Sequence, residues 1–129
     1  MGVPSDASAT RVPPGWPEQV LPPQAPEWET SAVAWLLDQC PPEYRAHDVL
    51  RTHPVVLARF AREHAAAAVA AARQGWRTVR AELKGVVPPE VVEAAVGVYD
   101  REGRRLAQTE QAVALVEAAL KGERWVPRL

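Results

Sequence analysis

His64 and Glu110 come nearest, among the residues of this chain, to a constellation that could perform acid–base chemistry. A carboxylate beside an imidazole orients the ring and raises its pKa, which suits a general acid or base. The pattern places no nucleophile beside the two residues. We therefore expect a polar pair that fixes the alignment of two helices. We assign no catalytic residue, and we retain an acid–base enzyme as an alternative function.

Metal and thiol chemistry have less support. A protein metal site needs at least three converging ligands, whereas His53 and His64 lie roughly 16 Å apart along a helix that rises 1.5 Å per residue. We expect no metal and no cofactor. The single cysteine, Cys40, ends an apolar stripe just before Pro41. We expect a thiol packed in the core rather than a nucleophile activated by His47.

A stripe of basic side chains is the strongest surface feature. At 100° per residue its members fall within a sector of roughly 60° on one helix. This basic stripe consists of Arg59, Arg62, Arg73, Arg77, Arg80 and Lys84. Such a stripe can contact phosphates, but we identify no aromatic side chain beside the arginines that would stack on bases.

The charge of the N-terminal part opposes that of the basic stripe. Residues 1–53 carry seven acidic and three basic side chains, whereas residues 54–84 carry six basic and two acidic ones. We expect the N-terminal part to neutralise the stripe partially, within one chain or across a dimer. We expect Arg73, Arg77 and Arg80 to remain the more available cations.

Two long helices must position these side chains. No proline interrupts the chain between Pro54 and Pro88, and apolar residues recur there at a period near 3.6. Gly85 is a typical C-terminal cap, and a second helical pattern runs from Pro88 to about Lys121. The sequence predicts an all-α fold dominated by a long antiparallel helical hairpin.

The facing residues of this hairpin follow from a turn centred near Val87. Large residues then lie opposite small ones, as in a close-packed helix pair. The expected facing pairs are Gly75 with Tyr99, Ala71 with Gly103, and His64 with Glu110. The expected inner face of the first helix is formed by Val56, Leu57, Phe60, His64, Ala67, Ala68, Ala71, Gly75, Val79 and Leu83.

Two shorter helices and an arm rich in proline and tryptophan precede the hairpin. Prolines within residues 1–25 exclude regular helix there. We expect the first ten residues to be disordered and Trp16 to pack on the helices. Helices are predicted from Pro26 to about Cys40 and over residues 42–51. The predicted organisation is an arm, 1–25, and one helical domain, 26–129.

Bulk properties suggest a cytoplasmic protein that does not enter membranes. The formal net charge is −1 at pH 7. The longest apolar run, Ala65 to Ala72, falls short of the roughly 20 residues that a membrane helix needs. The segment from Met1 to Asp6 lacks the basic start and apolar core of a signal peptide.

Several short motifs stand out along the chain. They are Gly15-Trp16-Pro17, Pro26-Glu27-Trp28-Glu29, the run from Ala34 to Pro42, the run from His53 to Arg59, and Val126-Pro127-Arg128-Leu129. Together these motifs resemble a group of small uncharacterised helical proteins of high-GC actinobacteria. The resemblance covers about residues 12–129 and implies a cytoplasmic helical protein, with no activity to transfer.

The sequence therefore favours a non-enzymatic protein–protein interaction or regulatory module built on a helical hairpin. Its partner would be another protein or a second copy, because one short N-terminal segment covers only part of a two-helix hairpin and pairing would bury the rest. The first alternative, which we do not favour, is a small nucleic-acid-binding regulator that uses the basic stripe. The second is an enzyme centred on His64 and Glu110.

Overall fold

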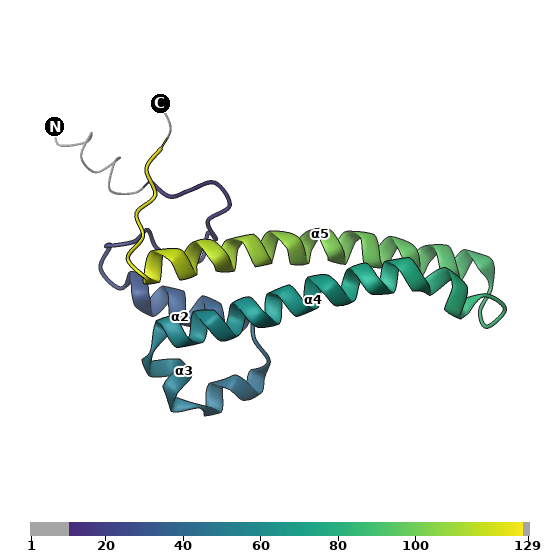
Figure 1. Ribbon diagram of the computed structural model, residues 1–129, viewed down its shortest axis with the longest axis horizontal. Coiled ribbons are helices and arrows are strands. Elements are labelled where there is room, and N and C mark those ends of the chain that lie inside the picture. Colours follow the sequence, from purple (N-terminus) through teal and green to yellow (C-terminus); the bar gives the residue numbers. More distant parts are fainter. Residues whose placement is uncertain (1–10, 128–129) are drawn as a thin grey trace.

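A long antiparallel hairpin dominates the computed structural model, which describes residues 11–127 (Figure 1). Its two helices are α4, Pro54–Leu83, and α5, Pro89–Leu120. Each helix has proline in its first turn, where the missing N–H costs no helical hydrogen bond. In the turn between them Gly85 adopts a φ of 77°, a conformation that glycine reaches without strain. The predicted all-α hairpin is confirmed.

Within the described residues three short elements precede the hairpin, one more than predicted. Helix α2 spans Trp28–Asp38. The predicted helix over residues 42–51 is divided into a 3₁₀ helix, η1, at Pro42–Ala46 and a short α-helix, α3, at Asp48–Thr52. His47 separates them with an extended backbone, so the chain turns there instead of continuing one helix.

The main core lies at one end of the hairpin. Helix α2 packs against both α4 and α5, and α3 packs against α4. The core cluster takes its hairpin side chains from residues 57–61 and 112–116 only. We call residues 54–68 and 108–120 the proximal half, and residues 69–83 and 89–107 the distal half. In Figure 1 the distal half extends beyond α2 and α3 toward the turn.

The arm contributes directly to the proximal core. Val20 is 3% exposed and belongs to the core cluster, and Trp16 and Trp28 are half-buried against it. The indole Nε1 of Trp16 donates a hydrogen bond to the carbonyl of Val20 at 2.9 Å. The two indole rings lie 6.5 Å apart. Trp16 therefore packs as predicted, while the expectation for the first ten residues lies outside the described part of the chain.

The predicted inner face of α4 is partly wrong. Gly75 faces Tyr99 as expected, since a Cβ on Gly75 would overlap the tyrosine ring. Ala71 is exposed, however, and a Cβ on Gly103 would meet nothing within 4 Å, so these two residues are not in contact. Phe60 is 41% exposed and packs edge-to-face on Tyr44 at 6.0 Å.

The buried side of α4 lies about one residue from the predicted one. Ala58, Ala61, Ala65 and Ala72 are buried, whereas the expected His64 and Ala67 are exposed. Alanines occupy every side of α4 between residues 65 and 72. The apolar pattern therefore specifies the orientation of this helix only weakly.

Alanine at two glycines of the hairpin should have opposite effects on stability. Gly103→Ala should raise the free energy of unfolding by roughly 0.5–1 kcal/mol, because alanine favours helix and its methyl group meets open space. Gly75→Ala should lower it by about 1–3 kcal/mol through overpacking against Tyr99. Urea denaturation of both variants and the parent measures this. Equal stability of the two variants would contradict the arrangement of the helices.

Candidate interaction surface on the hairpin

Three members of the basic stripe are paired within the hairpin itself. The Nε atom of Arg62 lies 2.8 Å from Glu117 Oε1, and Arg59 Nε lies 3.8 Å from Glu63 Oε1. Arg80 donates two hydrogen bonds to Glu93, of 2.9 and 3.0 Å. These hydrogen bonds hold the pKa of Glu93 below its ordinary value. The pair therefore contributes stability at neutral pH and loses it as the pH falls through the lowered pKa.

The source of this neutralisation differs from the prediction. The ion-pair partners that the structure describes for the basic stripe lie on α4 and α5, not in residues 11–53. The N-terminal acids Asp38 and Asp48 pair locally, with Arg45 and Arg51. Arg80, which we expected to remain available, is held by Glu93.

Arg73 and Arg77 form no ion pair with any residue of the described range 11–127. Arg77 donates one hydrogen bond of 3.2 Å to the side chain of its neighbour Gln74. The two arginines lie one helical turn apart on the exposed side of α4, about 6 Å along the axis. Their charges are therefore available to a partner.

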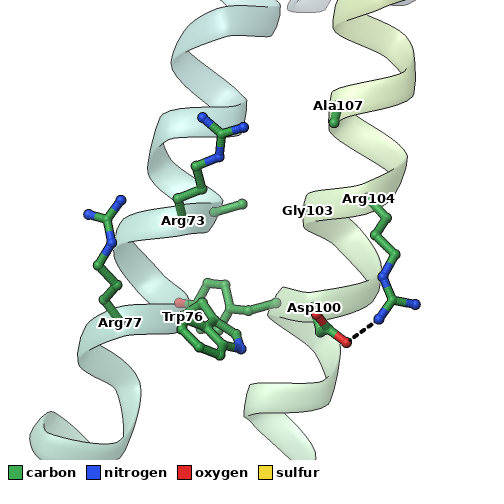
Figure 2. Close-up of a pocket in the computed structure, with 9 residues that line it drawn as sticks. Arg73, Trp76, Arg77, Asp100, Gly103, Arg104 and Ala107 are labelled. Atoms are coloured by element: carbon green, nitrogen blue, oxygen red, sulfur yellow. Dashed lines mark hydrogen bonds and ion pairs between the residues drawn. The ribbon is translucent and has the colours of Figure 1, made fainter.

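Both arginines border a groove of about 310 Å³ between α4 and α5. Figure 2 shows Trp76 lying across this space, with Arg73 and Arg77 extending from α4. On the opposite side Arg104 donates a hydrogen bond of 2.6 Å to Asp100. This space, which we call the groove, is lined by Ala72, Arg73, Trp76, Arg77, Tyr99, Asp100, Gly103, Arg104 and Ala107.

Trp76 is the residue that the sequence reasoning missed. Its side chain is 46% exposed, although tryptophan is highly buried on average. Trp76 follows Arg73 by three residues and precedes Arg77 by one, so all three project from neighbouring positions of one helix. This spacing in the sequence could have indicated an aromatic side chain beside the basic stripe. The inference that no aromatic side chain accompanies the basic stripe is wrong.

The predicted contact between His64 and Glu110 is not formed. His64 is exposed and lines a separate hollow of about 290 Å³ together with Cys40 and Thr109. Glu110 is half-buried, and neither residue takes part in an ion pair within the described chain. The rotation of α4 relative to the predicted orientation turns His64 away from the α4–α5 contact.

Cys40 is a core thiol, as predicted. It belongs to the core cluster, and burial raises its pKa to about 11, a rise that the positive charge of Arg45 partly opposes. The thiolate is the nucleophilic form. Cys40 therefore remains a protonated thiol at neutral pH and is a poor nucleophile in this environment.

The buried polar contact of the hairpin involves Glu117. Its side chain is 9% exposed, and Lys121 Nζ lies 3.7 Å from Oε2, the oxygen opposite the one that Arg62 contacts. Within residues 11–127 that Oε2 atom accepts no hydrogen bond. A carboxylate that is removed from water destabilises the fold strongly when its cationic partner is lost.

The described residues form neither a metal-binding cluster nor a membrane-spanning helix. Between residues 11 and 127, no three His, Cys, Asp or Glu side chains gather as a metal ion would require. Over the same range, no helix combines the length and apolarity needed to cross a membrane.

Removal of Arg62 should cost more stability than removal of Arg59. Arg62→Ala leaves Glu117 buried beside Lys121 alone, so we expect a loss of about 1–3 kcal/mol in the free energy of unfolding. Arg59→Ala, whose partner is exposed, should cost no more than about 0.5 kcal/mol. The double variant Arg62→Ala/Glu117→Leu should recover most of the loss. Equal losses for the two single variants, in the same urea titration, would refute this role of Glu117.

The chain was compared with protein-family models, curated proteins and solved structures, and none of them matches it.

Proposed function

We propose that this chain is a non-enzymatic protein–protein interaction module of the cytoplasm, and that it holds its partner with the distal half of the hairpin. The observation that carries the proposal is the division of the hairpin into a covered and an uncovered half. The arm, α2 and α3 cover the proximal half. In Figure 1 no third element of the described chain lies beside α4 and α5 toward the turn, and the core cluster takes no side chain from the distal half.

The distal half has a thin core of its own. Its buried side chains are small or medium-sized. They are Val69, Ala72, Val79, Val92 and Val96. Other apolar side chains face outward, including Trp76 and Val98, which are 46% and 50% exposed. Helices in proteins owe most of their stability to tertiary packing of an apolar face, and exposed apolar patches mark interaction sites.

The same half is held firmly enough to present a fixed surface. Tyr99 packs over Gly75, and the two hydrogen bonds from Arg80 to Glu93 join the helices near the turn. A surface that is ordered before binding loses less conformational entropy when the partner docks. This arrangement suits a docking platform.

Nucleic-acid binding is the second candidate, and a specific observation favours it. Trp76 lies beside Arg73 and Arg77, so the groove combines a stacking surface with two cations. Asp100 lines the same groove, however, and Arg62 and Arg80 are already paired with carboxylates. Few cations therefore remain for a phosphate backbone, which ranks this function second.

An acid–base enzyme has the least support. His64 and Glu110 do not form the expected pair, and Cys40, which lies beside His64 in the same hollow, is kept protonated by burial. The proposed function therefore uses no catalytic residue.

Photo-crosslinking in cells that produce the protein tests the leading function. A benzoylphenylalanine at Trp76 or Val98 should give discrete protein adducts, because both positions are exposed in the distal half. The same probe at Leu21 or Val49, which are exposed at the proximal end, should give few. An adduct of twice the chain mass would identify a second copy as the partner. Adducts only at the proximal positions would refute the proposal.

Filter binding tests the nucleic-acid candidate. We expect a Kd weaker than roughly 1 µM for duplex and single-stranded nucleic acid at about 150 mM salt, because few free cations remain and each phosphate contact steepens the salt dependence by about one unit. Tighter binding that is lost in Arg73→Ala/Arg77→Ala would replace the leading function with this one.

A further inference from the structure

We infer that the groove binds an acidic amphipathic helix of a protein partner. One large apolar side chain of that helix enters the groove, and carboxylates one turn apart engage Arg73 and Arg77. This inference rests on the proposed function and specifies the partner's chemistry. It uses three features of the groove: its open floor, its exposed indole and the unequal charge of its two sides.

The floor of the groove is made by small residues. Ala72, Gly103 and Ala107 line it, and a Cβ placed on Gly103 would meet nothing within 4 Å. No side chain of residues 11–127 fills that space. A volume of about 310 Å³ accommodates a large apolar side chain, and a helix that docks in a groove presents such anchors at intervals of one turn.

Trp76 supplies the apolar contact beside this space. The indole is 46% exposed and lies across the space between the helices (Figure 2). Tryptophan and arginine are the residues most often found to dominate binding energy at protein interfaces. An incoming apolar side chain would cover the exposed part of Trp76 and remove it from water.

The two sides of the groove differ in charge. On α5, Asp100 and Arg104 neutralise one another at 2.6 Å. On α4, Arg73 and Arg77 have no carboxylate partner within residues 11–127. The guanidinium group binds carboxylates through paired hydrogen bonds. The partner's acidic side chains should therefore lie along α4, at a spacing of one helical turn.

A second copy of the chain fits this charge pattern less well. Several carboxylates of its hairpin are already paired with arginines of the same chain, namely Glu63, Glu93, Asp100 and Glu102. The unpaired carboxylates of α4 and α5 are Glu82, Glu90 and Glu110, and no two of them lie one helical turn apart. A nucleic acid also fits less well, because Arg62 and Arg80 are already paired with carboxylates and few cations remain for a phosphate backbone. The chemistry of the groove therefore favours a different protein that carries free acidic groups.

Selection from a peptide display library tests this inference. The library presents helical peptides of roughly 18 residues with one face randomised, and the full-length protein is the bait. Selected peptides should carry a large apolar residue flanked within one turn by two acidic residues. Fluorescence anisotropy should then show binding about tenfold weaker to Arg73→Glu/Arg77→Glu, to Trp76→Ala and to Gly103→Leu.

Matched variants control for charge and for helix substitution. Arg59→Glu/Lys84→Glu changes the net charge by the same amount on the same stripe, outside the groove. Gly97→Leu replaces another glycine of α5 that does not line the groove. Both should bind the selected peptides within about twofold of the parent. Circular dichroism of every variant verifies that the helices are retained.

Other outcomes overturn the inference. These are a selection that yields no binder, neutral or basic peptides, or peptides that bind the groove variants as tightly as the parent. Self-association or nucleic-acid binding that the groove variants abolish would assign the groove to a second copy or to nucleic acid. If the groove fails these tests while the probe at Val98 still crosslinks a protein, the proposed function stands and only this inference falls.

Discussion

The closeness of α4 to α5 is the constraint on which the remaining structure depends. Small side chains on α4, among them Ala61, Ala65 and Gly75, allow the two helices to pack against one another. Such a contact buries little apolar surface per residue, so the hairpin cannot provide a large core by itself. The arm, α2 and α3 supply that core, and they do so at one end only. The uncovered half follows directly from this arrangement.

The extent of the hairpin could be predicted because proline and glycine mark helix ends by local chemistry. Pro54, Gly85 and Pro89 fall where the helices begin or end. The side of α4 that is buried could not be predicted, because alanine is equally apolar on every side of the helix. The contact between Arg62 and Glu117 was missed for the same reason, since a different helix rotation brings different polar residues together. The division of η1 from α3 depends on the backbone at His47, for which the sequence pattern gave no signal.

The site was predicted in part. The basic stripe lies on the surface of α4, but which cations are free depends on the carboxylates that α5 brings opposite them. Periodicity alone does not show that Glu93 reaches Arg80, or that Arg73 meets no acid within residues 11–127. The stripe thus divides into arginines that hold the hairpin together and arginines that are available for recognition. Trp76 lines the same groove as the available arginines, and its place beside them could have been recognised from the sequence spacing.

The confinement of the core to one end also implies a gradient of local unfolding. Opening of the turn and distal half exposes few buried side chains, whereas opening of the proximal half disrupts the cluster of Leu36, Leu57, Val113 and Val116. Amide hydrogens of α4 and α5 should therefore exchange faster toward the turn, in a partly independent cooperative unit. A partner bound to the distal half would slow that exchange by mass action, in proportion to the occupancy of the site. Binding would therefore bring the free energy of opening of the distal half closer to that of the proximal half.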